Sequence, residues 1–292
     1  MARWAPRLTN RDGRPQVGLV LSGGGARCYA QVGALKALEE AGFAVAAIAA
    51  NSSAAILGAI YASCGDARQL EAVTLDIDFS SFLDLDGSTG LFGHEGVKEL
   101  LGKHAKATFE ELEIPLAVPA VDIERAELLI FNKGPIVPPV CASNAFPGLF
   151  TPVEYLGRNL MDGGIVNNFP VDIIRSMTSR PVLAIDTRPS PTAPLDLGGA
   201  TPSTLLGKLG ALFSQGVPTT VDILTQAYNI TQARVVEITC ALHPPDLRLV
   251  SDLPHDLDIQ SFLRIEEALE IGYVCVKEAV AAGRFEVLTL GD

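Results

Sequence analysis

Three polar residues, Asn51, Ser52 and Ser53, stand between two alanine-rich apolar runs in the segment IAANSSAAILGAIYA. A serine at the tip of an abrupt strand-to-helix turn can act as a nucleophile, because the turn exposes its hydroxyl in front of a helix N-terminus. The usual pattern of such a nucleophile elbow is Gly-x-Ser-x-Gly, since strand and helix approach closely there. Ala50 and Ala54 take the glycine positions, so we expect the elbow to form at some steric cost. An ordinary linker would also fit these five residues.

A glycine turn, SGGGARC at residues 22–28, follows the apolar run VGLVL and precedes a helical pattern. Backbone N–H groups in such a turn can bind the oxyanion that forms during acyl transfer. A dinucleotide-binding turn is disfavoured, because Cys28 replaces the last glycine of Gly-x-Gly-x-x-Gly and the second predicted strand ends at Asn51 instead of an acid. A merely structural glycine turn is the remaining alternative.

The acidic residue Asp162 ends a short apolar stretch in LMDGGIVNNFP, where two glycines allow the chain to turn beside it. A lone Asp-Gly-Gly is more often an ordinary turn. The chain has four histidines, none in a comparable turn motif: His94, His104, His243 and His255. Asp162 is therefore the candidate base for Ser52. No clustered Cys, His and acid spacing indicates a metal site, and we expect no cofactor.

The elements that must position these residues alternate between strands and helices. Buried strands are predicted from Val17 and from Val45, followed by helices from Tyr29 and from Ala54. Later buried strands are predicted at PLAVPAVDI from Pro115, LLIF from Leu128, PVLAID from Pro181 and RVVEIT from Arg234. This order predicts a single three-layer α/β/α domain over residues 17–292, with a mainly parallel central sheet.

Two segments are predicted to lie outside the packed domain. Residues 1–16 form a flexible N-terminal arm, whose arginines either touch an anionic surface or are inert. A mobile excursion is expected around 188–230, beginning with the Pro/Gly-rich stretch RPSPTAPLDLGGATP. Within it, TPSTLLGKLGALF from Thr201 has one apolar helical face, which fits core packing, a lid or membrane docking.

Composition excludes several classes of protein. With 292 residues, 48% of them hydrophobic, and a mean hydropathy of +0.29, the chain can bury a substantial core. A net charge of −12 argues against nucleic-acid binding, which needs clustered Lys and Arg.

Five scattered cysteines and the lack of a signal-like run predict reduced thiols in a cytoplasmic protein. Residues 43–62 approach the length of a membrane span, but their polar centre favours two buried elements.

Together, the three motifs in this order resemble the patatin-like phospholipase family. The resemblance runs roughly from Val17 to Thr187, through GGGARCYAQVGALKALEEAG, ANSSAAILGAIYA and CASNAFPGLFTPVEYLGRNLMDGGIVNNFPV. It implies that Ser52 is the nucleophile and Asp162 the general base, and that Ser52 is preferred to Ser53. It also implies an oxyanion hole formed by the backbone of Gly23, Gly24, Gly25 and Ala26, with Arg27 beside them.

The resemblance implies a lipid ester as substrate and partner, hydrolysed through an acyl-enzyme. The first hypothesis is a cytoplasmic serine acyl hydrolase of phospholipids or lysophospholipids, with peripheral membrane contact as an option. Ala50, Ala54 and Cys28 depart from the family pattern, which motivates a second hypothesis, a weakened or inactive relative that binds lipid or a partner. An acyl transferase with the same nucleophile is a third. Head group, acyl position, oligomeric state and any activating ligand stay open.

Overall fold

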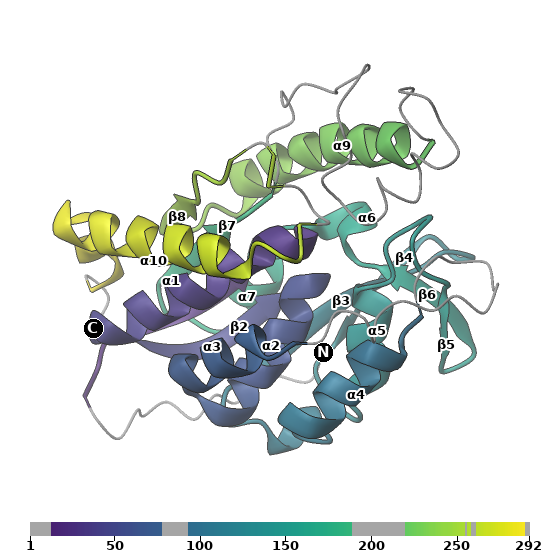
Figure 1. Cartoon of the computed structure of the whole chain (residues 1–292), viewed down its shortest axis with the longest axis horizontal. Coiled ribbons are helices and arrows are strands. Elements are labelled where there is room, and N and C mark those ends of the chain that lie inside the picture. The colour runs from purple at the N-terminus through teal and green to yellow at the C-terminus, as the bar shows by residue number, and fades with distance from the viewer. Residues whose placement is uncertain (1–12, 78–92, 189–219, 255, 258–260, 290–292) are drawn as a thin grey trace.

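The computed structural model describes residues 13–77, 93–188, 220–254, 256–257 and 261–289, and its centre is an eight-stranded mixed sheet (Figure 1). Five strands pair in parallel in the order β3-β2-β1-β7-β8. Three further strands pair antiparallel at the β3 end. The strands are β1 (Gln16–Leu21), β2 (Ala44–Ala50), β3 (Leu116–Asp122), β4 (Glu127–Phe131), β5 (Val153–Tyr155), β6 (Arg158–Asp162), β7 (Val182–Asp186) and β8 (Leu247–Val250).

Helices cover both faces of the sheet, which confirms the predicted α/β/α layering. The helices are α1 (Tyr29–Glu40), α2 (Ser53–Cys64), α3 (Ala67–Leu75), α4 (Glu95–His104), α5 (Val137–Ser143), α6 (Gly164–Asn167), α7 (Val171–Met177), α9 (Thr220–Leu242) and α10 (Ile265–Ala281). Short 3-10 helices are η1 (Gly25–Cys28), η3 (Phe109–Glu111) and η4 (Arg284–Leu288). One core cluster joins the sheet to α1, α2 and α10, and another joins its opposite face to α7 and α9. Figure 1 accordingly shows α9 and α10 on opposite sides of β7 and β8.

Strand register explains how distant sequence motifs meet. β1 and β2 run parallel with Leu21 opposite Ala50, so the turns that follow the two strands lie side by side. β3 pairs antiparallel with β6, and this register places Asp162 opposite Ala120. The carboxyl ends of neighbouring parallel strands share one edge of a sheet, where ligand sites of α/β folds form. The glycine turn and the polar triplet therefore converge at this edge. Asp162 joins them although β6 is antiparallel, because its partner Ala120 lies three residues beyond Ala117, the β3 residue opposite Ala49.

Two predicted strands differ in the structure. RVVEIT from Arg234 is part of the helix α9, not a buried strand. Its β-branched residues favour a strand locally, but the buried side chains Gln232 and Val236 are four residues apart, which matches one helical face. LLIF from Leu128 is a strand, β4, but it pairs antiparallel with β3 and is only partly buried, with Ile130 exposed.

The segments predicted to lie outside the core are described only in part. Residues 1–12 of the predicted arm lie outside the described residues, and Gln16 already belongs to β1. Residues 189–219, which include TPSTLLGKLGALF, also lie outside them, whereas residues 220–230 of the predicted excursion begin α9. Among the described helices, none has the length and apolarity needed to span a membrane. The apolar stretch 43–62 is divided between β2 and α2.

Helices α1 and α10 touch through their backbones. A methyl group on Gly33 would overlap the Leu269 carbonyl, and one on Gly272 would overlap the Ala30 carbonyl. Both glycines are therefore required by close approach of the two helices. This contact fastens the end of the described chain to its first helix.

We predict that Gly272→Ala lowers the free energy of unfolding by about 1–3 kcal/mol, because the two helices must separate to admit the methyl group. Gly102→Ala on α4 is the matched control, since a methyl there meets nothing within 4 Å. That variant should be as stable as the wild type, or more stable by up to about 1 kcal/mol. Urea denaturation measures both, and an unchanged Gly272→Ala would contradict the backbone contact.

Candidate active site

Ser52 occupies a sharp turn between β2 and α2. Its backbone has φ 58 and ψ −138, a conformation that costs free energy for any residue with a side chain. The peptide N–H of Ser52 donates to Ser143 Oγ at 3.0 Å, and its carbonyl accepts from the Ala55 N–H at 2.8 Å. These bonds hold the strained residue in place. The strand–turn–helix that the sequence predicts is present, with Ser52 at its tip.

The hydroxyl of Ser52 points at the acid. Ser52 Oγ donates a hydrogen bond of 2.7 Å to Oδ2 of Asp162, the last residue of β6. The side chain of the adjacent Ser53 turns elsewhere, with its Oγ 3.0 Å from Asn144 Oδ1. The structure thus brings Ser52 and Asp162 together and separates Ser53 from the acid.

The carboxylate of Asp162 is almost completely buried, with 1% of the residue exposed. Its Oδ1 accepts from Asn51 Nδ2 at 3.0 Å and from the Gly164 N–H at 2.7 Å. Burial raises the pKa of Asp162 from 3.8 to about 6, because the charged form is poorly solvated, whereas the hydrogen bonds from Ser52, Gly164 and Asn51 act to lower it. The group is ionised at neutral pH and is still a far better proton acceptor than an exposed aspartate.

Asn51 ties the acid to the rest of the site. Besides Asp162, its Nδ2 donates to Asn168 Oδ1 at 2.9 Å, and its Oδ1 accepts from Ser143 Oγ at 3.2 Å. Sequence reasoning treated Asn51 as an elbow spacer and missed Ser143, Gly164 and Asn168. The sequence could have indicated two of them, because Gly164 and Asn168 belong to the same DGGIVNN motif as Asp162.

The glycine turn lies directly against Ser52. A methyl group on Gly23 would overlap Asn168 Oδ1 and would lie 2.8 Å from Ser52 Cβ. Hydrogen bonds between described residues do not engage the peptide N–H groups of Gly24, Gly25 or Ala26, whereas the Gly23 N–H has a long contact of 3.4 Å with the Asn168 carbonyl. These three backbone donors follow directly on Gly23, which lies against Ser52.

Arg27 lies beside these donors, and its own donors are engaged in further hydrogen bonds. Its peptide N–H donates to the Gly24 carbonyl at 3.2 Å, and its buried side chain donates from Nε to the Thr187 carbonyl at 2.8 Å. Nη1 donates to the carbonyls of Pro254 and Leu257. These bonds fasten the turn to Thr187, which follows β7, and to Pro254 and Leu257, so Arg27 supports the candidate oxyanion hole and does not supply its donors.

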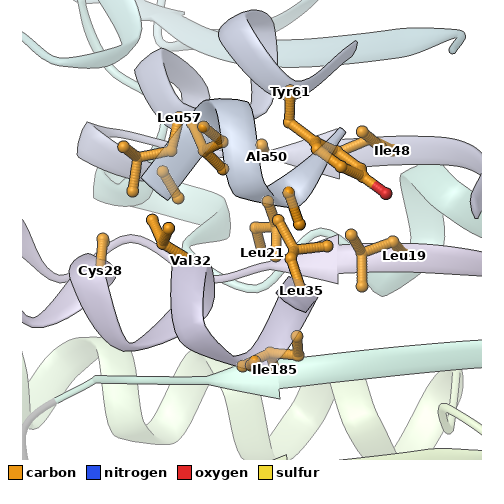
Figure 2. Close-up of a cluster of buried hydrophobic side chains, with 14 of the residues drawn as sticks. Leu19, Leu21, Cys28, Val32, Leu35, Ile48, Ala50, Leu57, Tyr61 and Ile185 are labelled. Atoms are coloured by element: carbon orange, nitrogen blue, oxygen red, sulfur yellow. The ribbon is translucent and has the colours of Figure 1, made fainter. Parts of the chain in front are cut away.

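The three departures from the family pattern lie in packed surroundings. A methyl group on Gly58 would lie 3.1 Å from Ala50 Cβ, so Gly58 provides the room that the Ala50 methyl group needs. Ala54 and Cys28 are fully buried. Figure 2 shows Cys28 and Ala50 in one apolar cluster with Val32 and Leu57. Burial raises the pKa of the Cys28 thiol to about 12, so it is a protonated core residue.

The remaining candidates for catalysis or metal binding do not join this constellation. His94 pairs through Nε2 with the Thr151 carbonyl at 2.9 Å and stacks on Phe150 at 5.5 Å. Over the described ranges, no group of three or more His, Cys, Asp and Glu side chains has an arrangement that could hold a metal ion. All five cysteines are free thiols.

We predict that Ala50 and Gly58 are energetically coupled. The change in the free energy of unfolding caused by Gly58→Ala should be more favourable by about 1 kcal/mol in the Ala50→Gly background than in the wild type. Ala50→Gly removes the methyl group that Gly58→Ala would otherwise crowd. Urea denaturation of the two single variants and the double variant measures this coupling free energy. Additive effects would show that the elbow does not depend on this pair.

Comparisons with known proteins identify the family of the chain. The sequence model described as "Patatin-like phospholipase" matches residues 19–175. Patatin-like phospholipase domain-containing protein 7 of Rattus norvegicus is 34% identical over 180 residues, covering 58% of this chain and 13% of that protein. An uncharacterized NTE family protein of Mycobacterium tuberculosis is 31% identical over 188 residues, covering 62% of this chain and 51% of that protein.

Longer and more distant matches extend beyond these residues. A second uncharacterized NTE family protein of Mycobacterium tuberculosis is 28% identical over 289 residues, covering 94% of this chain and 48% of that protein. The chain thus spans about half the length of these mycobacterial relatives. The crystal structure of VipD from Legionella pneumophila shares the fold, with a TM-score of 0.55 at 14% identity over 97% of this chain and 71% of that one. Because the family's sequence model covers more than half of its residues, including the glycine turn, the elbow and the acid, the chain belongs to the patatin-like phospholipase family.

Proposed function

We propose that this protein is a serine acyl hydrolase that cleaves fatty-acyl esters of phospholipids or lysophospholipids with a Ser52–Asp162 dyad. The observation that carries the proposal is the 2.7 Å hydrogen bond from Ser52 Oγ to the buried Asp162 carboxylate. Membership of the patatin-like phospholipase family supports the class of substrate. The free N–H groups of the neighbouring glycine turn support acyl transfer as the class of reaction.

In this mechanism, Asp162 accepts the hydroxyl proton as Ser52 Oγ attacks the ester carbonyl. The N–H groups of Gly24, Gly25 and Ala26 stabilise the negative charge on the carbonyl oxygen. The protonated Asp162 then gives its proton to the leaving alcohol, and the acyl group stays on Ser52. Water attacks the acyl-enzyme with Asp162 again as base, which releases the fatty acid and restores the serine.

The alternative of a weakened or inactive relative has less support. It was motivated by Ala50, Ala54 and Cys28, and the side chains of all three are buried in the apolar core. An acyl transferase would form the same acyl-enzyme and differ in its acceptor. Adding a lysophospholipid acceptor to the assay distinguishes the two, because a hydrolase releases free fatty acid and a transferase forms the diacyl lipid.

Covalent labelling tests the nucleophile. We expect a fluorophosphonate probe to label the wild type and Ser53→Ala, but not Ser52→Ala, because only the Ser52 hydroxyl is bonded to a base. Ester hydrolysis by Ser52→Ala should fall by at least about 10³-fold. Intact-protein mass spectrometry measures the labelling. A folded wild type that takes up no probe would refute the proposal.

The pH dependence tests the base. We expect kcat/KM for a soluble ester to rise with pH and level off above about 6, because Asp162 accepts a proton only when ionised and its pKa is about 6. Asp162→Asn should abolish turnover, since a neutral amide cannot take the proton.

His94 is the control for this pH profile. Burial lowers the pKa of His94, so that its imidazole also titrates in the acidic range. His94→Gln should keep the same profile as the wild type. Near-normal turnover by Asp162→Asn, or loss of the pH dependence in His94→Gln, would place the base elsewhere.

A further inference from the structure

The inner face of α9 reaches the site from the second half of the chain. Tyr228, Gln232 and Val236 follow one another at intervals of four residues, so they lie on one side of the helix. Gln232 Nε2 donates to the Ile165 carbonyl of α6 at 3.1 Å, and Val236 packs with Phe169 in the core under this face. These two contacts fix the helix directly beside the segment that follows Asp162.

Tyr228, one turn before Gln232, covers the turn that carries the acid. A methyl group on Gly164 would overlap the Tyr228 hydroxyl and would lie 2.9 Å from both Asp162 Oδ1 and Asn51 Nδ2. The phenol oxygen and the carboxylate oxygen thus border the same small space above Gly164. The Tyr228 ring also meets Phe146 edge to face, with 4.9 Å between ring centroids.

Phe146 connects this aromatic pair to the backbone of the acid. The preceding residue, Ala145, accepts a hydrogen bond of 3.1 Å from the Asp162 N–H. Asp162 is therefore bordered by Ser52 and Asn51 on one side, by its own Gly163–Gly164 turn, and by the Phe146–Tyr228 pair.

We propose that Tyr228 is a positioning residue, whose ring excludes water from Asp162 and so keeps the carboxylate a strong base for Ser52. The inference rests on the proposed dyad and extends it to a residue outside the segment matched by the family's sequence model. An ion in a region of low polarity is destabilised relative to its neutral form, so each group that displaces water from Asp162 strengthens it as a base.

The electrostatics of the site agree with this arrangement. The charge of Asp162 adds to burial in raising the pKa of Tyr228 well above its ordinary value, so the phenol stays neutral throughout the working range. Cys28, which also feels the charge of Asp162, has a pKa of about 12. The positive charge of Arg188, which is paired with Asp186 at 2.7 Å, acts to lower the pKa of Tyr228. Neither Tyr228 nor Cys28 changes charge near pH 6, where Asp162 does.

The pKa of Asp162 can be measured directly by NMR of protein labelled with ¹³C at the aspartate carboxyl carbons, with Asp162→Asn to assign the signal. In Tyr228→Ala we expect this pKa to fall by about one pH unit or more, because water reaches the carboxylate. The acidic limb of fluorophosphonate labelling should move to lower pH by the same amount, and labelling at neutral pH should slow. Tyr228→Phe, which keeps the ring and removes only the hydroxyl over Gly164, should lower this pKa less than Tyr228→Ala does.

Ile230→Ala is the matched control, because Ile230 lies on the outer face of the same helix and is 50% exposed. It should leave the Asp162 titration unchanged. If Tyr228→Ala does not fold, Tyr228→Leu keeps apolar bulk on the helix but is too short to reach Gly164, and it should also lower the pKa. An Asp162 pKa unchanged in the folded Ala or Leu variant, or lowered equally in Ile230→Ala, overturns the proposal.

The NMR titration needs no turnover, so it separates this inference from the proposed function. If the wild type fails to label but Tyr228→Ala still lowers the Asp162 pKa, the role of Tyr228 stands and the hydrolase assignment falls. If the wild type is labelled with an acidic limb near pH 6 and the Tyr228 variants keep that limb, the hydrolase assignment stands and the proposed role of Tyr228 falls.

Discussion

The burial of one ionisable carboxylate is the constraint around which this end of the sheet is organised. A charge that loses its water must receive hydrogen bonds, and Asp162 receives them from a hydroxyl, an amide side chain and a peptide N–H. The hydroxyl is that of Ser52 in the strained elbow, the amide is that of Asn51 just before it, and the peptide N–H is that of Gly164 in the turn after β6. Moving any of these elements would leave an unpaired group in the interior, which is far more costly than an ordinary surface rearrangement.

Small residues make this crowding possible. Gly23 faces Ser52, Gly58 faces Ala50, Gly163 lies against Pro119 and Asn51, and Gly164 lies beneath Tyr228. At Gly23, Gly163 and Gly164 a methyl group would meet backbone or a polar side chain of the site, and at Gly58 it would meet the Ala50 methyl group. At the elbow, Ala50 fills space that a glycine would leave free. Gly58, in the helix α2 that follows, restores that space.

The sequence was informative where chemistry and backbone geometry are encoded within a few adjacent residues. The glycine turn, the polar triplet and the Asp-Gly-Gly motif each have a local signature, and parallel strands bring their ends to one edge by rule. Side-chain networks between distant segments have no such signature, and so the bonds of Asn51 to Ser143 and Asn168 could not be predicted. In RVVEIT from Arg234, the β-branched residues favour a strand, whereas the spacing of the buried residues matches a helix. The segment is helical in the structure because packing outweighs local propensity. The hydrogen bond from the Arg27 side chain to the Thr187 carbonyl could not be predicted either, because adjacency in sequence does not give the direction of a long side chain.

The contact between α1 and α10 also has a consequence for the order in which the chain can fold during synthesis. α1 follows directly on the glycine turn, but its partner helix and the matching glycine come some 240 residues later. Until the ribosome has released Gly272, the apolar side of α1 that packs on α10 has nothing to cover it, however well β1 and β2 have already paired. Contacts of such long range are late and slow to form. The nascent protein thus presents an uncovered helix face beside the glycine turn, a surface that chaperones would be expected to bind until α10 has been synthesised.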